Sequence, residues 1–134
     1  MPVNEQSALS RLDSAFELLA RGEVDEALSC AEVALAASDP ELRLVAHLCC
    51  ALAWRQLGRH DAVIQHLQIC DSHPAAPVEC KRWMGDAYLA CGAYMKAITY
   101  YDELLIRYPR RFDVHRRKLR ALWGHICSFF RGTS

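Results

Sequence analysis

The sequence predicts an all-α fold, in which helical hairpins repeat along the chain to form an α-solenoid. Similar residues recur at intervals of 36 and then 34 residues. Within each repeat, apolar residues recur at every third or fourth position, which is the spacing of one helix face. Glycines and prolines mark the ends of the helical segments. The 134 residues are 52% hydrophobic, which is enough to form one packed domain spanning residues 1–134.

Seven positions of the repeat carry residues of matched size and polarity in all three copies. The columns are Gly22/Gly58/Gly92, Ala15/Ala51/Gly85, Leu18/Trp54/Tyr88, Ala27/Val63/Ala97, Leu28/Ile64/Ile98, Ala31/Leu67/Tyr101 and Ala34/Cys70/Leu104. Small residues in two of these columns allow two helices to approach closely, and the large aromatic residues fill the space between neighbouring hairpins. The repeats therefore span about residues 8–41, 44–77 and 78–111.

Each repeat consists of two helices around a tight turn. The first helix ends at the glycine, because glycine adopts the left-handed conformation after a helix without a Cβ clash. The second helices begin at Val24, His60 and Tyr94. Prolines close the repeats, since proline does not continue a helix from within.

One further helix follows the third repeat, at about residues 112–130. Its apolar stripe contains His115, Leu119, Leu122, Trp123 and Ile126. A solenoid needs a terminal helix over its last core face, so this stripe is predicted to pack inward as a cap. Whether Trp123, Phe129 and Phe130 are all buried stays open, and apolar surface left there would be a second docking face. The basic cap surface, which consists of Arg116, Arg117, Lys118 and Arg120, is predicted to face solvent.

The repeat pattern resembles the tetratricopeptide repeat (TPR). The third copy matches best, with Gly85, Tyr88, Gly92, Tyr94, Ala97, Tyr101 and Pro109 where the family has them. The first copy departs from the pattern at Leu18 and Val24, and the second departs at His60 and Val63. The resemblance covers about residues 8–111. It implies a right-handed α-solenoid of three hairpins with a C-terminal capping helix.

The resemblance also implies that the first helices of the hairpins line a concave groove that holds a partner protein. The implied groove residues are Leu9, Leu12, Phe16, Leu19, Val45, Leu48, Leu52, Arg55, Glu79, Arg82, Asp86 and Leu89. The groove changes from apolar to polar along the chain, which favours an apolar or amphipathic partner segment. Two alternatives stay open. The apolar residues of the first helix pack on the protein itself, or a second copy covers them in a homodimer.

Two uses of the family place different demands on these positions. Members that clamp a carboxylate tail need basic and amide side chains where this chain has Leu12, Phe16 and Leu52, and Asp86 adds a negative charge. A carboxylate clamp is therefore not expected. In overall plan the chain is similar to small cytoplasmic chaperones of bacterial secretion systems, which hold an export substrate in an apolar groove.

Neither catalysis nor a cofactor is expected. The chain has no phosphate-binding glycine loop, GxSxG, HExxH or paired-carboxylate motif. His66, Cys70 and His73 have a spacing that zinc could use, but Cys70 lies in a core column and His73 in the linker. We therefore expect no metal site. Seven cysteines without a CxxC pair are typical of a reducing compartment.

Charge is unevenly distributed, although the net charge is zero. Residues 1–45 carry nine acids and three bases, whereas residues 107–134 carry one acid and eight bases. An alternative function is therefore a scaffold that docks an acidic partner through the basic C-terminal helix. Nucleic acid is a weaker candidate, because the sequence pI is about 7.0 and no aromatic residues alternate with the bases. No apolar run reaches the roughly 20 residues of a membrane span, so we expect a cytoplasmic protein without a membrane partner.

Overall fold

The fold is all-α, as predicted. The computed structural model describes residues 4–132, and within this range the chain forms seven helices and no extended strand. The contacts between helices divide the chain into two compact units, Met1–Ala76 and Pro77–Ser134. The boundary lies in the proline-containing linker between the second and third predicted repeats. The two units are described separately below as unit 1 and unit 2.

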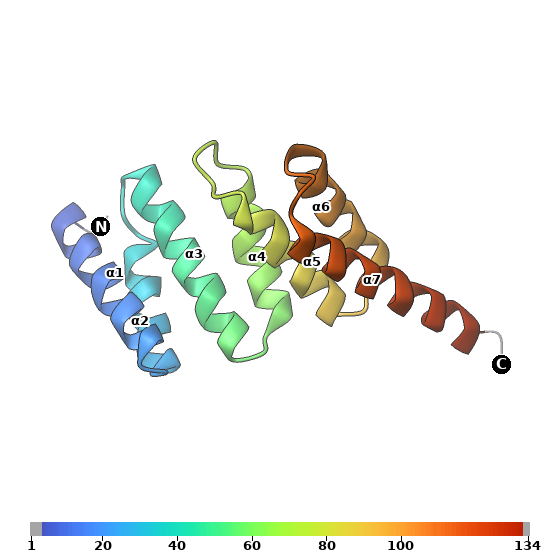
Figure 1. Cartoon of the computed structure of the whole chain (residues 1–134). Helices are drawn as coiled ribbons and strands as arrows, with labels where there is room; N and C mark the ends of the chain where they lie inside the picture. Colours follow the sequence, from blue (N-terminus) through green and yellow to red (C-terminus); the bar gives the residue numbers. More distant parts are fainter. Residues whose placement is uncertain (1–3, 133–134) are drawn as a thin grey trace. The chain divides into compact units, whose positions relative to one another are not determined.

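Unit 1 contains two helical hairpins. The first consists of α1 (Glu5–Ala20) and α2 (Val24–Ala34), and the second of α3 (Pro40–Gln56) and α4 (His60–Asp71). Helix α3 packs on α4 and also on both helices of the first hairpin (Figure 1). The core of the first three helices is built mostly from alanine and cysteine, which lets the helices approach closely.

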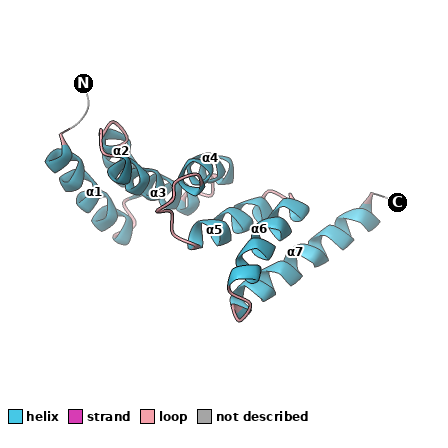
Figure 2. Cartoon of the chain, turned by 90° about the horizontal axis from the view of Figure 1, so that it is seen from above, coloured by secondary structure: helices cyan, strands magenta, loops and turns pink. Residues whose placement is uncertain are grey.

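Unit 2 contains the third hairpin and the terminal helix. The hairpin consists of α5 (Glu79–Ala90) and α6 (Tyr94–Arg107), and α7 (Phe112–Arg131) packs mainly on α6 and to a smaller extent on α5 (Figure 2). The core is formed by Ala97, Ile98, Tyr101, Leu104 and Leu105 of α6 together with Val114 and Ala121 of α7.

The three glycine turns have the predicted conformation. Gly22, Gly58 and Gly92 have φ values of +82°, +74° and +78°, in the left-handed region that side chains disfavour. In each turn the glycine N–H donates to a carbonyl three residues earlier, and the next N–H donates to a carbonyl five residues earlier. This pair of hydrogen bonds is the Schellman motif, which satisfies the last carbonyls of the first helix.

Helix boundaries follow from local signals in the sequence. Helices α2, α4 and α6 begin at Val24, His60 and Tyr94, as predicted. Pro40 does more than close the first repeat, because it is the first residue of α3 and follows an Asp39 side chain that accepts a hydrogen bond from the Glu41 N–H. Proline is favoured in this first position, where its missing N–H costs nothing.

The small-residue columns of the repeat are buried, as their role in close packing requires. Ala15, Ala51 and Gly85 are buried, and so are Ala27, Val63 and Ala97. The large residues of the repeat differ in how deeply they are buried. Tyr101 is completely buried, whereas Trp54 and Tyr88 are only partly buried against the cores of their units.

Candidate partner-binding surfaces

An open apolar hollow lies between α1 and α3 of unit 1. It is lined by Phe16, Leu19, Ala20, Leu52, Arg55 and Gln56 and has a volume of about 470 Å³. Phe16 is 39% exposed. Leu9, which lies about two turns earlier on the same face of α1, is 50% exposed. Leu9 and Phe16 form an apolar strip beside the hollow, and the cation of Arg55 lies at the edge of the hollow. This part of the predicted groove is therefore accessible to a partner.

Two of the groove residues predicted on α1 belong to the core instead. Leu12 and Leu19 are buried within the cluster of α1, α2 and α3, although Leu19 still forms the floor of the hollow. Leu12 and Leu19 are seven residues apart and share one helix row, whereas Leu9 and Phe16 share the next row. Because α2 and α3 both pack against α1, the first row is covered, and the second stays open. On α3, Leu48 and Leu52 are partly buried, as is Val45, and Arg55 is exposed.

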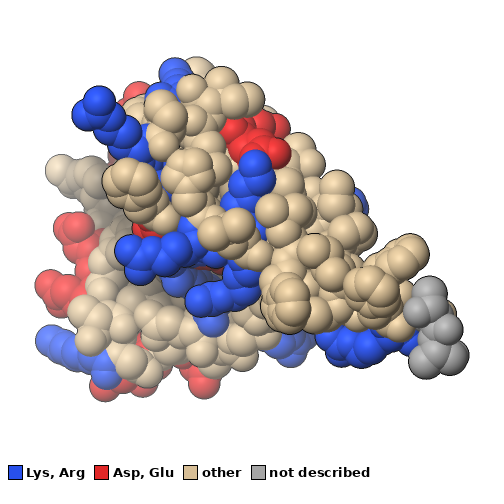
Figure 3. Space-filling view, turned by 45° about the vertical axis from the view of Figure 1, so that its right-hand side comes forward, with Lys and Arg blue, Asp and Glu red and all other residues tan. Residues whose placement is uncertain are grey.

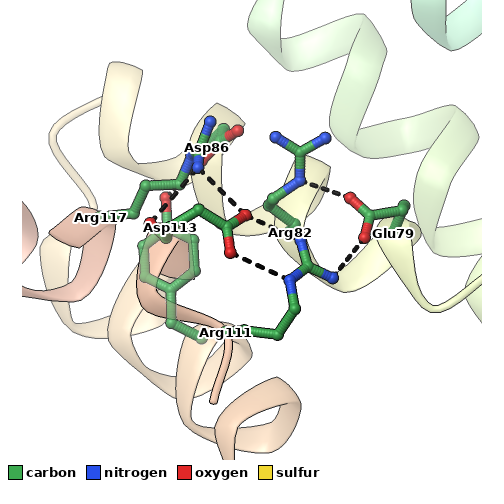
Figure 4. Close-up of polar contacts among 7 residues, drawn as sticks. Glu79, Arg82, Asp86, Arg111, Asp113 and Arg117 are labelled. Carbon is green, nitrogen blue, oxygen red and sulfur yellow. Dashed lines mark hydrogen bonds and ion pairs between the residues drawn. The ribbon is translucent and has the colours of Figure 1, made fainter. Parts of the chain in front are cut away.

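The three charged groove residues predicted on α5 take part in an ion-pair network with the start of α7 (Figure 4). Arg111 donates to both carboxylate oxygens of Asp113, at 3.0 and 2.8 Å, and it also donates to Glu79. Glu79 in turn accepts from Arg82. The Arg117 Nε lies 3.1 Å from an oxygen of Asp86.

The network also reaches the core of unit 2. The buried Tyr101 hydroxyl donates a 2.6 Å hydrogen bond to Asp86. Hydrogen bonds from arginine lower the pKa values of Asp113 and Glu79, which stay ionised in neutral solution. Arg82 and Asp86 are therefore bound to neighbours within the unit. Leu89, the remaining predicted groove residue, packs partly against the core and lines a small hollow with Asp86, Arg117 and Arg120.

The predicted orientation of the C-terminal helix is wrong for its apolar stripe and for two of the four residues of the basic cap surface. Arg117 and Lys118 of the basic cap surface point toward the unit, where they pair with Asp86 and Asp102. Only Arg116 and Arg120 of that surface are exposed. The residues of α7 that pack inward are Val114 and Ala121.

The apolar stripe predicted to pack inward is exposed. Leu119, Leu122, Trp123 and Ile126 are between 37 and 68% exposed, and His115 is also at the surface. Phe112, Phe129 and Phe130 extend the exposed apolar residues over the whole helix. In Figure 3, uncharged side chains cover this end of the molecule as far as the C-terminal residues, with Lys and Arg side chains along one edge.

The reason for this orientation lies in the residues that α5 and α6 present to α7. They offer the carboxylates of Asp86 and Asp102, which attract Arg117 and Lys118, and the ring of Tyr94. A Cβ at Gly124 would overlap the Tyr94 ring, so that ring packs directly on the α7 backbone. The periodicity of the apolar stripe was interpreted as core-facing, and the alternative left open at Trp123, Phe129 and Phe130 is the one that the structure has.

The residues considered for zinc have other partners. His66 Nδ1 lies 3.0 Å from His47 Nδ1. His73 Nδ1 accepts a hydrogen bond from the Ala75 N–H. Cys70 is buried in the column predicted for it. Among residues 4–132, no three histidine, cysteine or acidic side chains converge as metal ligands would. All seven cysteines are free thiols.

No model of a known protein family matches the chain, and a search of curated proteins found no similar sequence. Within the part of the chain that the structure describes, no helix has both the length and the apolar character to cross a membrane.

Proposed function

We propose that this protein is a non-catalytic interaction module of the TPR type, which holds an apolar or amphipathic segment of a partner protein in unit 1. The observation that carries the proposal is the open strip formed by Leu9 and Phe16 beside the hollow between α1 and α3. Apolar side chains exposed in a concave site favour binding. When a ligand covers one of them, its apolar surface is removed from contact with water, which lowers the free energy.

The repeat supports the TPR assignment independently of any relative. The three hairpins have the same glycine turn, the same pair of turn hydrogen bonds and buried residues in the same two small-residue columns. A right-handed solenoid of these hairpins, in which the first helices share one groove, is part of the proposal.

The chemistry of the hollow indicates the kind of segment that fits. Its walls are mostly apolar, and Arg55 is the one charged residue among those that line it. An amphipathic segment with two or three large apolar residues and an acid nearby would satisfy both features. As a narrower form of the proposal, the partner is an aggregation-prone export substrate and the protein acts as a cytoplasmic secretion chaperone.

A display library of random peptides tests the proposal without knowledge of the partner. We expect the selected peptides to be rich in leucine and aromatic residues. Phe16→Asp should weaken their binding at least about tenfold, which corresponds to loss of one buried aromatic contact. Val33→Asp is the matched control, because Val33 is also 39% exposed but lies on α2, away from the hollow.

The readout is the dissociation constant from calorimetry, with helicity and thermal melting recorded for each variant. If no peptide is enriched, or if Phe16→Asp and Val33→Asp bind the selected peptides equally well, the hollow is not the binding site. If Phe16→Asp unfolds the protein, Leu9→Asp provides the same test at a more exposed position of the strip.

A further inference from the structure

The exposed face of α7 is a continuous apolar surface on a helix that is otherwise polar. With a rise of about 1.5 Å per residue, its 20 residues extend for about 30 Å. Phe112, Leu119, Trp123 and Phe130 recur along the helix at intervals of seven, four and seven residues, and so they share one side. The buried residues Val114 and Ala121 occupy the opposite side. The apolar face therefore points away from unit 2.

The second half of α7 extends beyond the body of the unit. Ala121 is the last buried residue, and none of residues 122–132 is buried. Figures 1 and 2 both show this half of the helix continuing past α6. A single projecting helix offers a convex surface, so a protein partner would need a groove of its own to cover it. The fluid interior of a lipid bilayer adapts to such side chains without a preformed site.

The charge beside this face is positive and uncompensated. Unit 2 has five acidic side chains, and each forms an ion pair with a base of the same unit. Those pairs use Lys81, Arg82, Arg111, Arg117 and Lys118. Arg116 and Arg120, which flank the apolar stripe, have no acidic partner among the described residues. The surface around the stripe therefore attracts anions.

The same charges disfavour a second copy of α7 as the occupant. Two antiparallel helices related by a two-fold axis place equivalent flanks opposite each other. Arg116 and Arg120 would then face the same residues of the partner copy. The one acid of α7, Asp113, is already bound by Arg111 and Arg117.

We propose that α7 is an interfacial helix that binds the surface of an anionic lipid bilayer. Trp123, Phe130 and their apolar neighbours enter the boundary between headgroups and acyl chains, and Arg116 and Arg120 contact the lipid phosphates. Unit 2 stays on the water side, so binding needs no rearrangement of the fold. The sequence-based expectation of no membrane partner considered only spanning segments.

Flotation with lipid vesicles tests the proposal on the full chain. We expect the protein to float with vesicles of equal parts phosphatidylserine and phosphatidylcholine at low salt, and to stay unbound with phosphatidylcholine alone. Trp123→Glu combined with Phe130→Glu should weaken binding by about a hundredfold or more, roughly the effect of losing two large apolar contacts. Met95→Glu, at an exposed apolar residue of α6, is the matched control and should bind like the parent.

A second pair of variants isolates the charge. Arg116→Glu with Arg120→Glu should weaken vesicle binding by about 25-fold or more, because each cation near an anionic surface contributes about a fivefold factor and both are lost. Arg11→Glu with Arg21→Glu makes the same change in net charge on exposed residues at α1 and should have little effect. Helicity and thermal melting show that each variant is folded.

Three outcomes would overturn the proposal. The folded parent does not float with the anionic vesicles at low salt. The variant with Trp123→Glu and Phe130→Glu floats with these vesicles as well as the parent does. Alternatively, light scattering shows a dimer that the Trp123/Phe130 variant dissociates while no vesicles are bound, which would assign the face to self-association. None of these outcomes depends on Phe16, so the proposed peptide site is tested separately.

Discussion

Gly85 of α5 lies directly against the ring of Tyr101 on α6, so closely that a single Cβ at Gly85 would overlap the ring. Tyr101 has no room to retreat, because it is completely buried and its hydroxyl donates to Asp86. Gly85→Ala should therefore lower the free energy of unfolding by about 1–3 kcal/mol, through overpacking. Urea denaturation followed by circular dichroism measures this loss.

The control for this prediction adds one heavy atom at an exposed position of the same helix, where there is room for the larger side chain. Ala90→Ser alters the exposed end of the same helix and should leave stability within about 0.5 kcal/mol of the parent. Equal stability of Gly85→Ala and the parent would show that α5 and α6 do not approach as closely as described.

Loss of the Tyr101 ring is expected to be the most harmful core change in unit 2. Tyr101→Ala removes the largest fully buried side chain, so it should cost about 3–5 kcal/mol by forming a cavity. Tyr101→Phe keeps the ring and removes only the hydroxyl that donates to Asp86, and it should cost about 0.5–1.5 kcal/mol. Thermal and urea unfolding of both variants give the comparison. A Phe variant as unstable as the Ala variant would contradict this division between packing and hydrogen bonding.

The two helix rows of α1 should respond differently to the same truncation. Leu12→Ala removes a buried side chain and should destabilise the protein by about 2–5 kcal/mol. Leu9→Ala removes a side chain that is half exposed, so its effect should be below about 1 kcal/mol. Urea denaturation of the two variants distinguishes the core row from the open strip. A larger loss for Leu9→Ala would reverse the assignment of the rows.

His47 and His66 should make stability depend on pH. Their rings meet at 3.0 Å between the two Nδ1 atoms, a contact that needs a proton on only one of them. Burial lowers the pKa of both histidines, and His66 lowers that of His47 further. The unfolded chain therefore binds protons more readily, so this contribution is present above about pH 6.5 and is lost as the pH falls below that value.

Urea denaturation across the weakly acidic range measures the effect. The variant with His47→Gln and His66→Gln should show a flatter dependence of the unfolding free energy on pH in this range. His60→Gln, outside the pair, should keep the slope of the parent. A double variant with an unchanged slope would assign the pH dependence to other groups.

Thiol reactivity should separate the buried cysteines from the exposed one. Burial raises the pKa of Cys49 to about 11 and that of Cys50 to about 12, and the thiolate is the reactive form. Cys91 is exposed at the end of α5. Iodoacetamide should therefore label Cys91 first in the folded protein, and mass spectrometry of the digested product identifies the site. Rapid labelling of Cys49 under native conditions would show that this core opens readily.

The sequence alone determined the features that depend on neighbouring residues along the chain. The glycine turns at Gly22, Gly58 and Gly92 and the first residues of α2, α4 and α6 were predicted correctly, because helix stops and starts are local. The burial of the small-residue columns was also predicted, since a column that recurs in three hairpins reports a shared contact.

Only the tertiary structure decided which face of a helix is covered. Leu12 and Phe16 are both apolar, yet Leu12 is buried in the cluster of α1, α2 and α3 and Phe16 stays accessible. Helix α7 has an apolar face and a basic face, and periodicity alone does not tell which one packs on α6. The carboxylates of Asp86 and Asp102 and the ring of Tyr94 select the face with Arg117, Lys118 and Gly124. Ion pairing and close contact with small residues thus turn the apolar face of α7 toward solvent.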